Sequence, residues 1–419
     1  SLSLSEKYGL YQNCYNSFTS LVNEHDSIIN SNSLQELIYA CEQRKLHRSA
    51  ILGNVFKAVL HIRKNEYDKA EAILYEMMHE SEKINFRFGI ATVYHRLGQN
   101  CLFKSEYVEA LKFLLKAIQI NTNEGYTEAQ ALNHYFLGLI EFKLGNFDNA
   151  TENILKSLAY WENVGNKANM WNCNEVLGNI CIKCQDFEKA LHYHRIALNI
   201  REQTINYRIS KGGNKLTENY LGVAYSYNNI AETYLNMGIA DSALFYAIRS
   251  LEIKLSENSV AYAMDVANSH LILGKVYHTL RKHDSAIIIL NRAAESYKKI
   301  GNKSGQSEAL LGLGKAYVST NLPDKAIIAY ETGLSLAKEA NAKSNILEGY
   351  QLLNEYYTKE RNFEKALLHF NSYNNYKDSI FNIERINKIE ELQIKYETEK
   401  QQQELEFHKV LVQKKKPSA

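Results

Sequence analysis

The chain has 419 residues, with 49 Lys and Arg against 47 Asp and Glu, 20 Gly and only 2 Pro. This balance gives no support for a nucleic-acid partner, since nucleic-acid-binding domains are usually clearly basic on one face. No apolar stretch approaches the ~18 residues that cross a bilayer, so we expect no membrane span in this chain. Average proteins contain ~5% Pro, and its scarcity here favours long helices joined by short turns.

Residues 1–45 carry apolar positions at helical spacing and are expected to form one or two helices. These positions are Leu10, Tyr11, Tyr15, Phe18, Leu21, Leu34, Leu37, Ile38 and Cys41. They lack the repeat described next, which is typical of a segment that caps an array. Residues 1–10 show no basic segment followed by an apolar one, so a signal peptide is either absent or already removed. The six Cys are too sparse for a disulfide scaffold and slightly favour the cytoplasm, whereas removal of a signal peptide would leave the periplasm open.

From residue 46 an internal repeat of constant length begins. A turn pattern of two polar residues, an aromatic, an acid, any residue and Ala recurs in full or degenerate form, ending at Ala70, Ala110, Ala150, Ala190, Ala243, Ala286, Ala326 and Ala366. Successive alanines are forty positions apart, except that the fourth and fifth intervals are longer by thirteen and three. Twelve residues before each alanine stands a small residue, at Ala58, Gly98, Gly138, Gly178, Ala231, Gly274 and Gly314, with Asn354 as the exception. Small residues in constant phase predict close contacts between paired helices.

These motifs resemble the tetratricopeptide repeat, whose signature joins an aliphatic-Gly pair, such as Leu273-Gly274, to an aromatic three residues later, such as Tyr277. The resemblance covers residues 46–376. It implies an all-α fold, a right-handed α-solenoid of about eight helix hairpins with a concave inner surface. The repeat is longer than the family's usual ~34 residues and is similar in length to that of kinesin light chains and many bacterial signalling proteins.

Two segments depart from the repeat. Thirteen extra residues near 206–219 include Lys211-Gly212-Gly213-Asn214-Lys215, which predicts a loop at the tip of an elongated hairpin. Residues 377–419 are rich in both charges and predict a long exposed helix and tail. This segment resembles the charged helix that follows such arrays in signalling proteins of the Bacteroidetes type. We expect the protein to be monomeric, or weakly dimeric through Ile386, Ile389 and Leu392.

The sequence offers little support for a metal site or a catalytic site. Cys181 and Cys184, with His192 and His194, have ligand types that suit zinc, but Cys181 and His194 occupy repeat core positions, so we expect no metal. No Gly-rich phosphate loop, nucleophile elbow or other catalytic motif is present. We therefore expect neither a cofactor nor enzymatic activity.

The resemblance implies that ligands meet the first helix of each hairpin three residues before, and one, four and five residues after, the small residue. The candidate binding residues at such positions are His95, Gln99, Phe103, Tyr135, Phe142, Lys143, Glu175, Asn179, Lys183, Asn228, Glu232, Asn236 and Lys275. Amide and aromatic side chains together suit an extended peptide, since amides bond its backbone and aromatics pack its side chains. The alternative for any one of them is a solvated surface without a ligand.

We interpret the chain as a non-enzymatic protein- or peptide-binding scaffold, the sensory or partner-binding region of a bacterial signalling protein. Two alternatives remain: a self-contained cytosolic adaptor or peptide receptor, and a phosphatase-like regulator. The last would need a catalytic residue in the N-terminal helices, and none is identifiable there.

Overall fold

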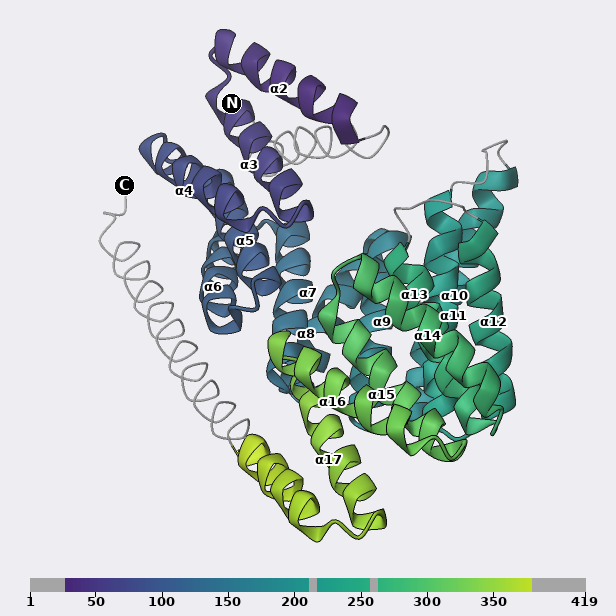
Figure 1. The fold of residues 1–419 in the computed structure, drawn as a ribbon. Helices are drawn as coiled ribbons and strands as arrows, with labels where there is room; N and C mark the ends of the chain where they lie inside the picture. Colours follow the sequence, from purple (N-terminus) through teal and green to yellow (C-terminus); the bar gives the residue numbers. More distant parts are fainter. Residues whose placement is uncertain (1–26, 211–216, 257–262, 379–419) are drawn as a thin grey trace, which may run out of the picture. The chain divides into compact units, whose positions relative to one another are not determined.

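A computed structural model of the chain describes residues 27–210, 217–256 and 263–378, and within these ranges the regular structure is α-helical (Figure 1). The described residues form two compact units, divided after Val164. Expectations for the helix before residue 27, the tip of the long insertion and the charged C-terminal segment lie outside the described residues.

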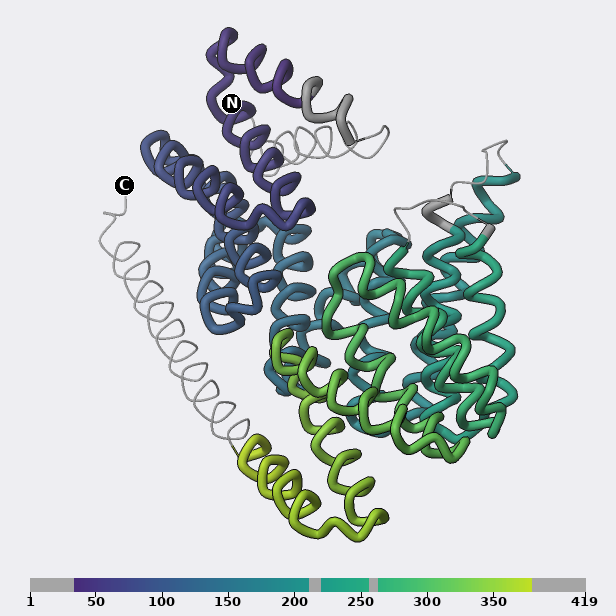
Figure 2. Tube along the Cα trace, viewed as in Figure 1, coloured from purple at the N-terminus to yellow at the C-terminus, as the bar shows by residue number. Residues whose placement is uncertain are grey.

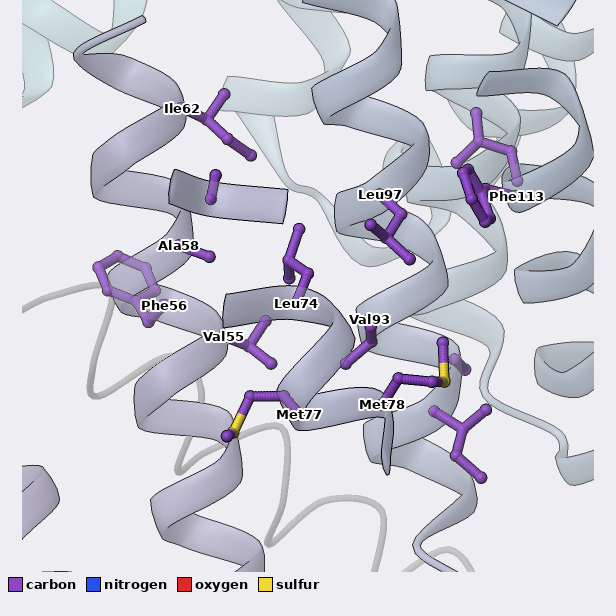
Figure 3. Packing of buried hydrophobic residues seen from close by; sticks show 14 of the residues in the cluster. Val55, Phe56, Ala58, Ile62, Leu74, Met77, Met78, Val93, Leu97 and Phe113 are labelled. Carbon is purple, nitrogen blue, oxygen red and sulfur yellow. The ribbon is translucent and has the colours of Figure 1, made fainter. Parts of the chain in front are cut away.

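The first unit contains helices α2 to α8, each 17 or 18 residues long. Their bounds are α2 Ser27–Gln43, α3 His47–Arg63, α4 Tyr67–Lys83, α5 Arg87–Phe103, α6 Tyr107–Glu124, α7 Thr127–Leu144 and α8 Phe147–Val164. One apolar core runs through this unit, and Figure 3 shows Val55, Leu74, Val93 and Leu97 meeting within it. In α2, Leu34 and Ile38 are buried in the same core.

The second unit contains helices α9 to α17 and a final helix at residues 363–378 (Figure 2). Their bounds are α9 Lys167–Lys183, α10 Phe187–Ser210, α11 Thr217–Asn236, α12 Ala240–Ser256, α13 Ala263–Thr279, α14 His283–Lys299, α15 Lys303–Ser319, α16 Pro323–Glu339 and α17 Lys343–Lys359. The loop that the sequence predicted at Lys211-Gly212-Gly213-Asn214-Lys215 lies outside the described residues and stays a prediction. The described part of the insertion is helical, since α10 continues through residues 206–210 and α11 begins at Thr217.

The eight predicted hairpins are confirmed, and the same turn joins most of their helices. A residue with positive φ stands at every twentieth position from Lys45 to Gln185, and again from Arg281 to Arg361. The next amide N–H then bonds to the carbonyl five residues back, as from Glu106 to Cys101 at 2.8 Å. This is the Schellman arrangement, which satisfies carbonyls left over at a helix end. Each turn therefore stops its helix at a fixed length.

The small residues of the repeat hold the hairpins together. A Cβ added at Gly98, Gly138, Gly274 or Gly314 would lie within 2.8 Å of the side chain sixteen residues later, which is Leu114, Ile154, Leu290 or Tyr330 respectively. Seven of the eight turn alanines are completely buried, and Ala366 is nearly so. In these four hairpins a large side chain on the second helix therefore packs directly against a glycine on the first.

His194 occupies this large position in the fourth hairpin, where its ring covers Gly178. The ring is fully buried, and neither of its nitrogens has a hydrogen-bond partner among the described residues. Burial lowers the pKa of His194 to about 4.

We therefore expect His194→Leu to stabilise the protein by about 1 kcal/mol or more at pH 7, since it removes buried polar atoms that lack partners. His194 takes up a proton near pH 6.5 in the unfolded chain but only near pH 4 in the folded chain. As the pH falls between these values, the free energy of unfolding of the wild type therefore decreases by up to about 3 kcal/mol because of this group. Urea unfolding measured from pH 4 to 8 should show that the free energy of unfolding decreases less steeply toward acid pH in the variant than in the wild type. Equal pH slopes would contradict this account.

Candidate functional site

Polar side chains replace part of the apolar core at three interfaces between successive hairpins. Each group combines three side chains at fixed places in the repeat. The first lies three residues before the small residue of one hairpin, and the second lies eleven residues after the turn alanine of that hairpin. The third lies five residues before the small residue of the next hairpin. In the first unit these are His95 on α5, Asn121 on α6 and Asn133 on α7, and all three are buried. His95 Nδ1 lies 2.5 Å from Asn133 Oδ1, and its ring meets Phe136 edge to face.

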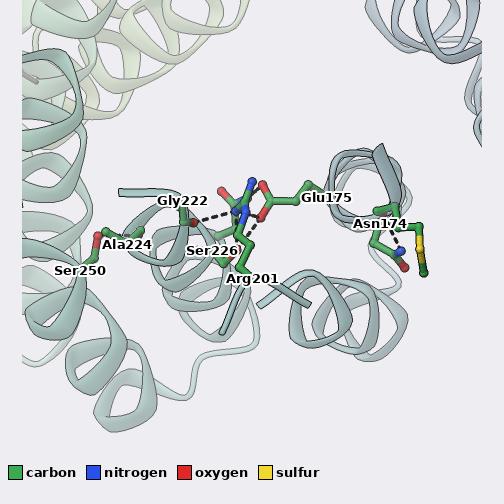
Figure 4. Close-up of polar contacts among 9 residues, drawn as sticks. Asn174, Glu175, Arg201, Gly222, Ala224, Ser226 and Ser250 are labelled. Atoms are coloured by element: carbon green, nitrogen blue, oxygen red, sulfur yellow. Dashed lines mark hydrogen bonds and ion pairs between the residues drawn. The ribbon is translucent and has the colours of Figure 1, made fainter. Parts of the chain in front are cut away.

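The second group is the buried ion pair of Glu175 on α9 and Arg201 on α10, with a 2.6 Å separation (Figure 4). Arg201 Nη1 also donates to the Gly222 carbonyl at 2.7 Å and to Ser226 Oγ on α11 at 2.6 Å. Asn229 Nδ2 donates to the other carboxylate oxygen at 3.0 Å. Burial raises the pKa of Glu175, while Arg201, Ser226 and Asn229 act against that rise. This network joins three helices of the second unit.

The third group consists of Asn228 on α11, Lys254 on α12 and Ser269 on α13. Asn228 Nδ2 donates to Ser269 Oγ at 3.0 Å, and Lys254 Nζ donates to the same hydroxyl at 3.0 Å and to the Asp265 carbonyl at 3.1 Å. Lys254 is 2% exposed, and this burial lowers its pKa to about 8.

Because the Lys254 ammonium group is buried, we expect the protein to become more stable as the pH rises above neutral. Between about pH 8 and 10.5 the unfolded chain holds a proton on Lys254 that the folded chain has lost, so the free energy of unfolding should rise with pH. The rise amounts to up to about 3 kcal/mol for a shift of this size. Lys254→Met should remove it in urea unfolding between pH 7 and 10. A rise that persists in the variant would assign it to another group.

These contacts give three of the candidate binding residues an internal role. His95, Glu175 and Asn228 are each less than 9% exposed and hydrogen-bonded to the first helix of the next hairpin. Their side chains are held between helices because the neighbouring first helix covers the position three before the small residue. A role for them in binding stays a prediction.

The other candidates on α11 and α13 lie together around a groove. Two adjoining hollows share Glu232, Ile272, Lys275 and Glu308. We call this the first-helix groove, because the residues that line it come mainly from the first helices of consecutive hairpins, α11, α13, α15 and α17. Further lining residues are Tyr225, Asn228, Asn229, Leu235, Asn236, Asn268, Leu271, His278, Thr279, Lys315 and Glu348. The groove thus gathers Asn228, Glu232, Asn236 and Lys275, as their positions in the repeat predicted.

A ladder of charges lines this groove, and part of it was missed in the sequence. Lys275 on α13 forms an ion pair with Glu308 on α15, and Lys315 on α15 pairs with Glu348 on α17 at 2.5 Å. In both pairs the Lys and the Glu are 33 positions apart in the sequence. Each Lys directly follows the glycine of its hairpin, and each Glu lies six residues before the equivalent position of the next hairpin, which is Gly314 or Asn354. This spacing is the signal that could have revealed Glu308, Lys315 and Glu348.

The remaining candidates occupy other surfaces. Gln99 and Phe103 on α5 line a hollow of the first unit beside Arg96, which donates to Gln99 at 2.7 Å. The other candidates of that unit lie on α7, where Lys143 is exposed; they are Tyr135, Phe142 and Lys143. In the second unit, α9 carries a partly exposed Asn179 and an exposed Lys183. Lys143 and Lys183 therefore belong to different units.

The described residues contain no cluster of three or more His, Cys, Asp or Glu side chains that could hold a metal ion. His194, one of the four candidate zinc ligands, instead covers Gly178. None of the described helices is both long and apolar enough to cross a membrane.

The groove and the hairpins define a class of helical-repeat protein. Residues 265–339, which cover α14, α15 and α16 and most of α13, match the family model of the tetratricopeptide repeat. Hairpins outside this span repeat the same turns, and Gly98, Gly138 and Gly178 likewise meet a large side chain sixteen residues later. Residues 265–339 therefore contain tetratricopeptide repeats.

Known proteins are similar to this chain in sequence or in fold. Protein KINESIN LIGHT CHAIN-RELATED 1 of Arabidopsis thaliana is 22% identical over 262 residues, covering 59% of this chain and 41% of the relative. The chain thus spans about two fifths of that relative's length. The apo quorum sensor NprR from B. thuringiensis has a TM-score of 0.64 at 14% identity, covering 87% of this chain and 98% of that one.

Two further solved structures were determined with a bound ligand. NprR in complex with its cognate peptide NprX has a TM-score of 0.56 at 15% identity, with coverages of 89% and 98%. A Rap protein complexed with competence and sporulation factor has a TM-score of 0.64 at 13% identity, with coverages of 90% and 99%. At these identities the likeness establishes the fold alone.

Proposed function

We propose that this chain is a non-enzymatic peptide-binding module, and that an extended peptide lies in the first-helix groove of the second unit. The observation that carries the proposal is the ladder of Glu232, Lys275, Glu308, Lys315 and Glu348 beside the amides and apolar side chains of α11 and α13. A similar fold in NprR holds a cognate peptide, which supports this class of ligand.

The groove offers each kind of contact that an extended peptide needs. Asn236 and Asn268 carry amides that can bond to peptide N–H and C=O groups, and Leu235 and Ile272 offer apolar surface. The two Lys–Glu pairs are already satisfied within the protein and fix the distances between successive first helices. A peptide therefore meets a preorganised surface, which lowers the entropy lost on binding.

A display library of random peptides, selected on the purified full chain, tests this proposal. Selected peptides should lose at least tenfold in affinity for the double variant Glu232→Gln with Lys275→Gln, because charge-assisted hydrogen bonds are worth about 1.5–3 kcal/mol each. The matched control is Lys303→Gln with Glu339→Gln, since this 2.9 Å pair is half exposed and does not line the groove. Selected peptides that bind all three proteins equally would place the site elsewhere.

We further propose that this binding serves regulation, with the chain as the sensory or partner-binding region of a bacterial signalling protein. The support is the fold shared with a quorum sensor and a Rap protein. In the native host, the double variant Glu232→Gln with Lys275→Gln should abolish the cell's response to the selected peptide. The control variant Lys303→Gln with Glu339→Gln should retain that response. A response unchanged by the groove variant would separate binding from signalling.

A further inference from the structure

The charge ladder of the first-helix groove contains one more acid than base. Its carboxylates come from Glu232, Glu308 and Glu348, and its ammonium groups come from Lys275 and Lys315. Glu308 and Glu348 each form an ion pair with one of the two lysines. Glu232 is the acid left over, because its side chain forms no hydrogen bond or ion pair with any other side chain that the structure describes.

The place of Glu232 in the repeat explains why it has no basic partner. In both ion pairs a Lys directly follows the small residue of one hairpin, and a Glu lies six residues before the equivalent position of the next. Between α11 and α13 these two places are occupied by Glu232 and Asn268. This step of the ladder therefore has a carboxylate and an amide but no cation.

Lys275 is influenced by the extra acid but does not form an ion pair with it. Burial tends to lower the pKa of Lys275, whereas Glu308, Glu232 and Glu348 raise it, and the net shift is upward. The ammonium group is therefore charged at neutral pH, and its ion pair is with Glu308. His278 also lines this part of the groove, and burial lowers its pKa, so it adds no charge at pH 7. The net charge of the lining is thus negative, which favours a positively charged ligand group.

Glu232 is accessible from the groove. The residue is exposed and lines both of the adjoining hollows, whose volumes are about 250 and 340 Å³. A single water needs only about 10–15 Å³ on this scale, so either hollow has room for a long side chain. Tyr225, two turns earlier on α11, lines the larger hollow and is 41% exposed, and its aromatic ring can attract a cation.

We propose that the peptide in the first-helix groove carries an Arg or Lys side chain that forms an ion pair with Glu232. This inference rests on the proposed function, and it narrows the ligand to peptides with a basic residue at the step between α11 and α13. The bound cation supplies the ion pair that this step of the ladder lacks. A guanidinium group can in addition stack on the Tyr225 ring.

Other side chains suit this step of the ladder less well. An acidic residue would meet Glu232 without a cation to spare, because Lys275 and Lys315 are already paired. An apolar residue would remove water from the Glu232 carboxylate without replacing its hydrogen bonds. A basic residue offers both the opposite charge and hydrogen-bond donors.

Parallel selections of a random heptapeptide display library on the full chain and its variants test the inference. On the wild type, Arg and Lys should be enriched at one peptide position relative to the unselected library. On Glu232→Lys, Asp and Glu should be enriched there instead. The matched control is Glu339→Lys, which reverses an exposed acid outside the groove and should select the same basic peptides as the wild type.

Synthetic peptides identify the charged group without a change to the wild-type protein. Replacing an enriched Arg with citrulline removes the charge and keeps the shape, and it should weaken binding at least tenfold in fluorescence polarisation, as for the loss of a charge-assisted hydrogen bond. The same replacement should make little difference to binding by Glu232→Gln, which has no carboxylate to pair. N-acetylation of the peptide should leave its affinity unchanged.

Three results would overturn the inference, and they can be told apart. Peptides that lose affinity for Glu232→Gln with Lys275→Gln but show no enrichment of basic residues would contradict the ion pair and leave the peptide groove in place. Peptides that bind this double variant as tightly as the wild type would contradict the proposed function as well. Affinity lost on N-acetylation but not on exchange to citrulline would place the cation at the peptide N-terminus and not on a side chain.

Discussion

Gly178→Leu is expected to destabilise the protein by about 3 kcal/mol. A Cβ at this position would lie 2.3 Å from the His194 ring, and further atoms would force the two helices of the hairpin apart. The buried ring has little room to move, since Ala190 and Ala197 beside it on α10 are completely buried. Urea unfolding monitored by circular dichroism measures the loss.

A second substitution tests the cause of this loss. In a His194→Ala background, Gly178→Leu should cost less than half as much, because the side chain it meets has been removed. Asn179→Leu, on the next residue of the same helix and partly exposed, should cost under ~1 kcal/mol. An equally large loss of stability from Gly178→Leu in the His194→Ala background would contradict the close contact between Gly178 and His194.

Arg201→Met is expected to cost about 3–5 kcal/mol, because it leaves the Glu175 carboxylate buried without its ion-pair partner. The loss should be largest at neutral pH and shrink in acid, where Glu175 can take up a proton. The double variant Glu175→Leu with Arg201→Met should recover most of the stability, since it removes both charges together.

An exposed pair provides the matched comparison. Lys303→Met breaks the pair with Glu339, whose side chains are 54% and 50% exposed, and should cost less than ~1 kcal/mol. Equal effects of Arg201→Met and Lys303→Met would show that the buried network contributes no more than a surface contact.

The sequence predicted the hairpins well because their packing depends on residue size at fixed spacing. Regularly spaced alanines, and glycines twelve residues before them, locate the contacts now seen between Gly98 and Leu114 or between Gly274 and Leu290. Side-chain volume can be read from a sequence, and helical periodicity places it on a face. Eight copies of one pattern made that reading secure.

Other features had no such signal. The division into two units after Val164 falls where Ala150 and Ala190 keep the regular repeat interval, so the repeat shows no change there. The burial of Glu175 and Arg201 also escaped prediction. An acid three residues before a small position is expected on the inner surface, and only the fold shows that α10 and α11 enclose it.

The residues that line the first-helix groove were predicted in part for a related reason. Glu232, Asn236 and Lys275 were found through the family's positions on the first helix, and they do line the groove. Glu308, Lys315 and Glu348 were missed because ion pairs between hairpins depend on how far apart successive first helices lie. That distance is a property of the packed array.

The positive-φ turns limit how the length of this chain can change. Successive turns in each regular run are twenty positions apart, so every helix between them is held to one length. Deleting a single residue from the middle of α14 would rotate the rest of that helix by about 100° and carry Leu290 away from Gly274. Deleting α13 and α14 together with their turns would instead bring α12 next to α15, a helix of the same type as α13. Laboratory or natural variants of this protein should therefore differ in length by whole hairpins, or by residues added within the turns themselves.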